Sequence, residues 1–326
     1  MAIKLRTKLT EMLGIEYPIL CGGMQWISRG PFVAEVCNAG ALGFITAETF
    51  ETPEDLREEI RKMRDLTDKP FGVNVSMVPE FGIAERTKQF CDVVCEEGVR
   101  VVETAGRSPA PLIPKLKEAG IKIIHKLTTV RHAVTAQRLG VDAVTLVGFG
   151  SGGHVGMDDV SNMILIPAAA ARLDIPVIAG GAIADGRGLV AALALGAEGV
   201  LMGTRFMVTN EAPLHDAIKE RVVKTAENGT VLVMRSIKNP IRCVRNMLAD
   251  EVLGIEDKGA TLEDILTKMA GRLGKQAYGT GECESSPIAC GQIAGLINEV
   301  KSVRQVIEDM ILEAEAVLGR LNGFVH

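Results

Sequence analysis

The sequence contains few aromatic residues, which make up 4% of its 326 positions, and Trp26 is its single tryptophan. It has no basic patch with interleaved aromatic side chains, and its net charge at pH 7 is −5, so nucleic acid is not an expected partner. It also has no run of 18 apolar residues and no continuous apolar segment near its first residue. Neither a membrane span nor a secretion signal is therefore predicted.

The 7 cysteines are scattered, without a C-x-x-C pair and without the His/Cys spacing of a zinc site. No metal centre is predicted for that reason. Unpaired thiols are typical of a reducing compartment. We expect a soluble, cytoplasmic protein that acts on a small molecule, and a second copy of the chain is the only macromolecular partner expected.

The sequence does contain short apolar runs that end in glycine or polar residues, separated by segments of helical length. This is the pattern of a parallel sheet that is buried on both faces. Eight such runs can be counted, so we predict a (β/α)8 TIM barrel. The predicted strands comprise residues 17–21, 42–46, 71–75, 100–103, 121–126, 142–147, 176–179 and 199–202.

The alternation stops after Phe206, and residues 208–275 show a charged, helical pattern without an obvious strand. We therefore predict a helical subdomain inserted between strand 8 and the final helix, with the barrel formed by residues 1–207 and 276–326. The final helix is predicted over residues 290–321, because apolar residues recur there at helical spacing.

Two glycine-containing turns follow the last two predicted strands, Gly180-Gly181 and Gly203-Thr204. Glycine lets bare backbone N–H groups approach an anion, and the loops after strands 7 and 8 of a TIM barrel commonly bind phosphate. The two turns together predict a phosphate-bearing ligand. Either turn alone is as well explained by a simple change of chain direction.

Four further side chains are candidates because they follow predicted strands or lie in flexible loops. His154 lies in a glycine-rich loop and can exchange protons near neutrality, although a solvated loop histidine is the alternative. Lys126 ends strand 5, where it could form a Schiff base, pair with phosphate, stand beside an anionic ring or extend into solvent. Asn74 could meet a ring edge or stabilise a turn, and Trp26 could stack on a ligand or cap the barrel.

Longer motifs give a resemblance to a known family. They are GGMQW (22–26), PFGVNV (70–75), HK (125–126), GGH (152–154), IPVIAGGAIADGRG (175–188) and ALGAEGVLMGTRF (194–206). The chain resembles the FMN-dependent nitronate monooxygenase and 2-nitropropane dioxygenase superfamily over its whole length. This superfamily also includes flavin enoyl-acyl-carrier-protein reductases and NADH:quinone reductases, and the latter are the most similar.

The resemblance implies a bound FMN and a catalytic residue, His154. It also implies a set of cofactor-binding residues, in which the phosphate lies on the glycine-containing turns, the ring lies on the first loop, and a glutamine lies nearby. These residues are Gly23, Met24, Asn74, Lys126, Gly180, Gly181, Gly203, Thr204 and Gln292.

Two departures from the family pattern affect the expected function. Val147 stands where relatives carry an acidic residue expected to bind a ribityl hydroxyl, and the first loop reads CGGMQW where well-known nitronate monooxygenases have QGPM. We therefore expect an oxidoreductase that takes hydride from NADH or NADPH and reduces a quinone-like or conjugated acceptor. The alternatives are a nitronate monooxygenase, an enoyl-thioester reductase, a Schiff-base aldolase using Lys126, and a flavin-binding module without catalysis.

Overall fold

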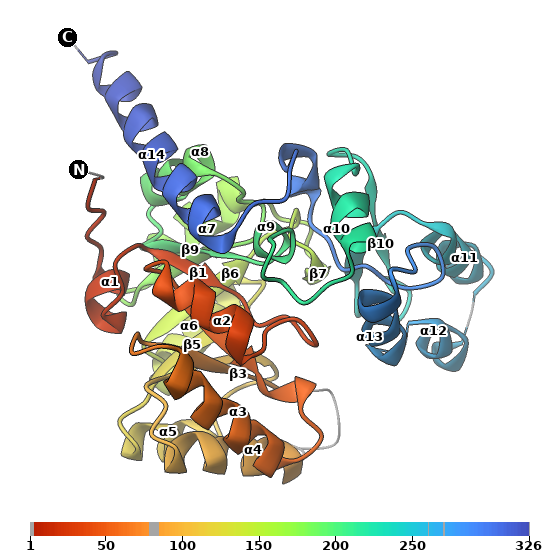
Figure 1. Cartoon of the computed structure of the whole chain (residues 1–326), viewed down its shortest axis with the longest axis horizontal. Coiled ribbons are helices and arrows are strands. Elements are labelled where there is room, and N and C mark those ends of the chain that lie inside the picture. The colour runs from red at the N-terminus through yellow and green to blue at the C-terminus, as the bar shows by residue number, and fades with distance from the viewer. Residues whose placement is uncertain (1–2, 78–84, 260, 270, 326) are drawn as a thin grey trace.

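The chain forms a closed barrel of eight parallel strands, which confirms the predicted (β/α)8 fold (Figure 1). The computed structural model describes residues 3–77, 85–259, 261–269 and 271–325. Each strand pairs in parallel with its neighbours, and β9 closes the barrel against β1. The barrel strands are β1 (Ile19–Cys21), β2 (Leu42–Thr46), β3 (Gly72–Met77), β4 (Val101–Gly106), β5 (Lys122–Leu127), β6 (Ala143–Val147), β8 (Val177–Gly180) and β9 (Gly199–Met202).

Helices surround the barrel, and their sequences define where they begin and which face they bury. In α3, Thr52 caps the first turn in a reciprocal capping box with Asp55, Pro53 takes the first helical position, and Leu56, Ile60 and Met63 face the barrel. The helices of the barrel layer are α2 (Gly30–Asn38), α3 (Pro53–Leu66), α4 (Glu85–Glu96), α5 (Ile113–Glu118), α6 (Val130–Leu139), α7 (Asn162–Ala170), α8 (Gly186–Ala194) and α14 (Val303–Asn322). None of the helices in the described ranges is long and apolar enough to cross a membrane.

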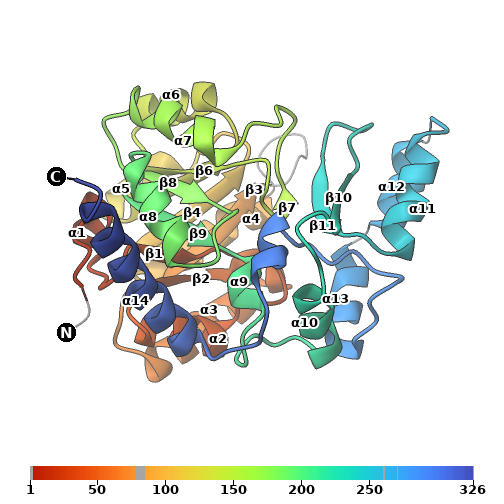
Figure 2. The ribbon, with the colours of Figure 1, turned by 90° about the horizontal axis from the view of Figure 1, so that it is seen from above.

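The short helix α1 (Lys8–Leu13) closes the N-terminal end of the barrel (Figure 2). Its Leu9 and Leu13 pack in one buried cluster with inward-facing residues of the strands, among them Leu20 and Phe44. Because apolar side chains fill this end, a ligand can enter only from the opposite end, where the strands terminate.

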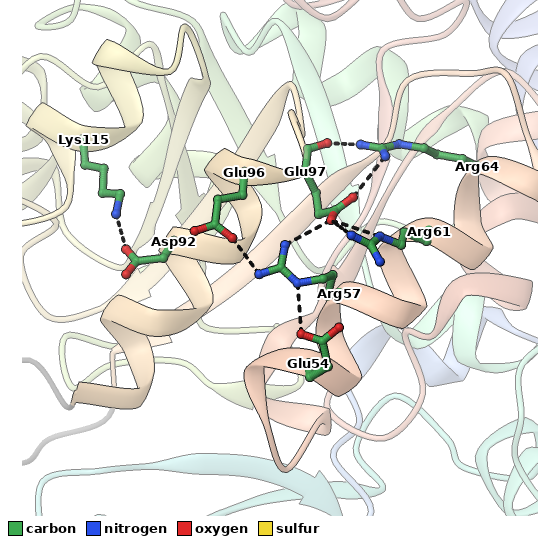
Figure 3. A network of polar contacts seen from close by, with 8 residues as sticks. All are labelled: Glu54, Arg57, Arg61, Arg64, Asp92, Glu96, Glu97 and Lys115. Carbon is green, nitrogen blue, oxygen red and sulfur yellow. Dashed lines mark hydrogen bonds and ion pairs between the residues drawn. The ribbon is translucent and has the colours of Figure 1, made fainter.

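A network of charged side chains joins α3 to α4 (Figure 3). The Glu97 side chain, which is 7% exposed, lies next to Arg57, Arg61 and Arg64, with N–O distances of 3.1, 2.9 and 3.1 Å. Desolvation raises the pKa of Glu97, but hydrogen bonds from Arg61 and Arg57 outweigh it, so the pKa is lowered overall. The network lies in the outer helical layer and stabilises the barrel there.

The prediction that residues 208–275 are entirely helical is wrong. This segment contains α10 (Asp216–Val223), α11 (Met247–Glu256), α12 (Leu262–Lys268) and the first half of α13 (Gly271–Thr280). It also contains the antiparallel hairpin of β10 (Thr230–Val233) and β11 (Ile241–Val244). A third strand, β7 (Gly153–His154), comes from the loop after β6 and pairs with β11. Strands of four residues leave little alternation in a sequence, and the third strand, β7, comes from a distant part of the chain.

The predicted single helix over residues 290–321 is also wrong in its first third. Gln292–Leu296 forms a 3-10 helix, η2, which ends at Ile297 in an extended conformation. Helix α14 begins only at Val303, where the Ser302 side chain accepts a hydrogen bond from the backbone N–H of Gln305. The apolar spacing continued through the break because Ile293 and Ile297 are buried in the same core as the helix.

A buried histidine on β5, His125, predicts a pH dependence of stability. Its side chain is 5% exposed and its Nδ1 lies 2.9 Å from Thr104 Oγ1. Burial lowers the pKa of His125 to about 4. Since the unfolded chain takes up this proton near pH 6.5, stability is complete above that pH and falls as the pH drops towards 4, by about 3 kcal/mol in total.

The measurement is the free energy of unfolding in urea between pH 4 and pH 8, for the native chain and for His125→Gln. We expect the free energy of unfolding of the native chain to fall relative to that of His125→Gln as the pH decreases from 6.5 towards 4. Parallel curves for the two proteins would show that His125 does not control this dependence.

Candidate active site

Three inward-facing polar side chains from adjacent strands meet at the open end of the barrel. Glu103 on β4 and Lys126 on β5 lie two residues beyond Val101 and Ile124 of the apolar interior, and side chains alternate between the two faces of a strand. Asn74 on β3 lies two residues beyond Gly72 and pairs in register with Glu103. Asn74 Nδ2 donates to Glu103 Oε2 at 2.5 Å, and Lys126 Nζ donates to the same oxygen at 2.8 Å. We call these three residues the polar belt.

The polar belt and its neighbours retain unused hydrogen-bonding capacity. Among the described residues, Glu103 Oε1, Thr46 Oγ1 and Thr145 Oγ1 are buried and have no hydrogen-bond partner. Buried polar atoms in native proteins are almost always paired, so unpaired ones at the end of a barrel indicate a ligand with a polar edge. Sequence reasoning missed Glu103, although a single acidic residue in the apolar run Val101-Val102-Glu103 was a usable signal.

The predicted phosphate turns lie side by side at the ends of β8 and β9. Gly181 has a φ of +68°, and a Cβ added there would lie 2.0 Å from Ser151 Oγ, so a side chain is excluded twice. Its own N–H donates to Leu201 O at 2.9 Å and is therefore engaged within the protein. Thr204 begins the short helix α9 (Thr204–Met207), whose first N–H groups have no partner within the helix.

The first loop, which contains Gly23 and Met24, lines the site next to the polar belt. A Cβ on Gly23 would lie 2.5 Å from Asn74 Cβ, and one on Gly203 would lie 3.5 Å from Met24 Sδ. The first loop thus approaches both the polar belt and the second phosphate turn. The structure therefore brings together the cofactor-binding residues predicted on these loops.

Gln292 reaches the same region from the far end of the chain. Its backbone N–H donates to Gly150 O at 2.9 Å, and Gly291 N–H donates to Thr204 Oγ1 at 3.0 Å. Gln292 lies in η2 and not in the long helix that was predicted, since α14 begins 11 residues later at Val303. These contacts hold η2 against the loop after β6 and against the second phosphate turn.

His154 lies in the short strand β7, where it pairs with Ile241 of the hairpin. Its side chain is exposed, yet the surrounding chain removes enough water to lower its pKa. A hydrogen bond with the Asn239 side chain opposes this shift, and the charge of Lys126 adds to it. The backbone of His154 is therefore held by the hairpin of the inserted segment, whereas its pKa also depends on Lys126, which belongs to the barrel.

Two arginines attach the hairpin to the loop that carries His154. Arg242, which is 3% exposed, donates from Nε and Nη2 to Phe149 O at 3.1 and 3.0 Å, and its guanidinium lies 4.5 Å from the centre of the Phe149 ring. Arg235 makes two parallel hydrogen bonds to Asp159, at 2.8 and 3.0 Å. The bidentate geometry fixes the orientation of each pair, so the hairpin positions His154.

Trp26 connects the first loop to α13, and which of its two predicted roles it has stays a prediction. Its indole N–H donates to Gly271 O at 3.2 Å, and Lys275 Nζ lies 4.6 Å from the ring centroid. Both partners belong to α13. Trp26 has a φ of 70°, a conformation that non-glycine residues adopt at a cost, so these contacts hold the first loop against the inserted segment.

Comparison with known proteins decides the family. A family model described as nitronate monooxygenase matches residues 6–313. The chain belongs to this nitronate monooxygenase family. Members of the family are flavin enzymes, so membership implies an oxidoreductase with a flavin cofactor.

The relatives cover nearly the whole chain but differ in reaction. One is the (3aS,4S,5R,7aS)-5-hydroxy-7a-methyl-1-oxo-octahydro-1H-indene-4-carboxyl-CoA dehydrogenase of Mycobacterium tuberculosis, 34% identical over 99% of this chain and 100% of the relative. A probable nitronate monooxygenase of Staphylococcus saprophyticus is 31% identical over 98% of this chain and all of its own. The structure of FabK from Thermotoga maritima superposes with a TM-score of 0.92 at 38% identity, over 98% of this chain and 99% of the other.

The residues present fit a flavin of the kind that the family implies. Glu103 Oε1 and the hydroxyls of Thr46 and Thr145, unpaired among the described residues, can bond to a polar ring edge. At Gly203 a Cβ would meet nothing nearer than Met24 Sδ at 3.5 Å, so a phosphate could approach the backbone where α9 begins. Val147, where the resemblance leads us to expect an acidic residue, is a buried apolar side chain beside Gly180 and offers no acceptor to a hydroxyl. The individual roles of the ten predicted site residues stay predictions.

Proposed function

We propose that this chain is an FMN-dependent oxidoreductase that takes hydride from NADH or NADPH and reduces a conjugated acceptor. The proposal is carried by buried polar atoms of Glu103, Thr46 and Thr145 at the open end of the barrel, which have no hydrogen-bond partner among the described residues. Burial and, to a smaller extent, the charge of Lys126 also lower the pKa of His154 in the loop that follows β6. Bound FMN would supply two-electron transfer between the nucleotide and the acceptor. The protein's own residues would then orient the acceptor and donate a hydrogen bond to its oxygen.

His154 is the residue that would handle the acceptor. Because its pKa is lowered, the ring is mainly neutral at pH 7 and carries one N–H donor. A neutral imidazole can donate this hydrogen bond to a carbonyl oxygen and so withdraw electron density from the conjugated double bond that is reduced. The anchored hairpin keeps the ring in place during this step.

The acceptor belongs to one of two classes. A quinone fits the resemblance to the family's NADH:quinone reductases. An α,β-unsaturated thioester fits because the Mycobacterium tuberculosis relative is named for a carboxyl-CoA compound. Both classes present a carbonyl oxygen conjugated to the bond that accepts hydride, so His154 would serve either in the same way.

A second candidate function is nitronate monooxygenation, which the family description and the Staphylococcus saprophyticus relative support. In that reaction the nitronate itself supplies the electrons and oxygen accepts them. His154 would then donate its N–H to a nitronate oxygen.

An anaerobic absorbance titration of the purified protein separates these functions. NADH, NADPH and an alkyl nitronate are added to separate samples, and the flavin band near 450 nm is followed. Bleaching by a pyridine nucleotide supports the reductase, and bleaching by the nitronate alone establishes the second candidate. A colourless protein that binds no added FMN contradicts both.

If a pyridine nucleotide reduces the flavin, the acceptor is then identified by nucleotide consumption. A benzoquinone and a short 2-enoyl-CoA are compared at equal concentrations, with the saturated acyl-CoA as a control that cannot accept hydride. Turnover with only one of the two acceptors identifies the class.

A further inference from the structure

The ion pair between Glu103 and Lys126 has features that separate it from an ordinary structural pair. Glu103 is 0% exposed, whereas the Lys126 side chain is 22% exposed. Both donors, Lys126 Nζ and Asn74 Nδ2, share one carboxylate oxygen, and the other oxygen is unpaired. A carboxylate this buried with half of its acceptors unused is not optimised for stability alone.

The pair also lies at the point where charge would affect a bound ring. Lys126 is one of the side chains that the resemblance places against the flavin, and its charge already reaches His154. A lysine that stood there alone would present a full positive charge to the site. With Glu103 Oε2 2.8 Å away, much of this charge is compensated inside the protein.

We propose that Glu103 is a positioning residue that holds the Lys126 ammonium in place and reduces the positive potential that it presents to bound FMN. The proposal rests on the proposed function, because it concerns the same cofactor site. Reduced FMN carries more negative charge than oxidised FMN, so a free cation favours the reduced form and a compensated one favours it less. Glu103 therefore lowers the midpoint potential of bound FMN, which favours hydride transfer from the reduced flavin to an acceptor.

The test compares Glu103→Gln with Lys126→Met. Glutamine keeps the size and the hydrogen-bonding oxygen of glutamate but removes the charge, which leaves Lys126 uncompensated. The ratio of affinities for reduced and oxidised FMN is obtained from the midpoint potential, measured with reference dyes at the same pH for every variant. We expect this ratio to rise by about tenfold in Glu103→Gln and to fall in Lys126→Met.

A matched control is Asp142, which directly precedes β6 and pairs with lysines near the start of β5. Asp142 pairs with Lys117 at 2.7 Å and with Lys122, the first residue of β5, at 3.6 Å. Asp142→Asn removes a paired carboxylate as Glu103→Gln does, but beside the Ile123 backbone, three residues or about 10 Å from Lys126 along β5. Its affinity ratio should equal that of the native protein.

A neutral pair keeps the test decisive if a single variant does not fold. Replacing a buried ion pair by apolar residues of similar size is often tolerated, so Glu103→Met combined with Lys126→Met is expected to fold. Its affinity ratio should exceed that of Lys126→Met alone, since the remaining negative charge has been removed. Circular dichroism of each variant shows which of them are folded.

The proposal is overturned if folded Glu103→Gln has the native ratio, or if its ratio shifts in the same direction as that of Lys126→Met. Its failure is distinguishable from failure of the proposed function. In the first case the native protein binds FMN and is reduced by a nucleotide, and only the charge effect is missing. In the second case the native protein binds no flavin or takes no electrons from NADH or NADPH.

Discussion

Gly181→Ala is expected to lose most of the protein's affinity for FMN, by about 100-fold or more. Two separate costs add up at this position. Its φ of +68° is strained for alanine, which accounts for about 1 kcal/mol. The added Cβ would also lie 2.0 Å from Ser151 Oγ and 3.0 Å from Ser151 Cα. Because the second contact involves backbone, a rotation of the serine side chain does not relieve it, and the turn has to move.

Gly140→Ala separates these two costs. Gly140 ends α6 with a φ of +94°, and a Cβ there would meet nothing within 4 Å. It therefore carries the strain without the steric overlap, and it lies away from the phosphate turns. We expect Gly140→Ala to lower the melting temperature while the FMN dissociation constant, measured by fluorescence quenching, stays native. Native FMN affinity in Gly181→Ala would remove this turn from the predicted phosphate site.

His154→Ala is expected to keep FMN bound and to slow reduction of the acceptor by between 10²-fold and 10⁴-fold, the usual contribution of a well-placed proton-handling group. Reduction of the flavin by NADH, which does not involve the acceptor, should change much less. Stopped-flow measurement of the two half-reactions distinguishes these effects. His132→Ala is the control, because His132 is exposed on α6.

The pH profile tests the protonation state in which His154 works. Since the pKa of His154 is lowered, the native rate should stay constant from pH 8 down to about 6.5 and decline only at lower pH. His154→Gln retains an N–H donor without a titrating group, so its acceptor reduction should be faster than in His154→Ala and should lack the acidic decline. Equal rates in all three proteins would exclude His154 from the mechanism.

Much of the site could be predicted from sequence because its residues follow predictable strands. In a parallel barrel every strand ends on the same face, so counting strands was enough to bring Asn74, Lys126, Gly181 and Gly203 together. Glu103 was missed because its importance depends on its neighbours. Only the register of β4 with β3 and β5 places its carboxylate between Asn74 and Lys126.

The sequence by itself determined the barrel, its open end and the glycine turns, because these follow from hydrophobic period and from residues with special backbone freedom. Only the tertiary structure decided how the inserted segment meets the barrel. The β10–β11 hairpin, its pairing with β7 and the anchoring of Phe149 by Arg242 join residues up to 93 positions apart. Such contacts leave no local pattern, since each partner by itself is an ordinary strand or loop residue. They fix the backbone of His154 against the hairpin.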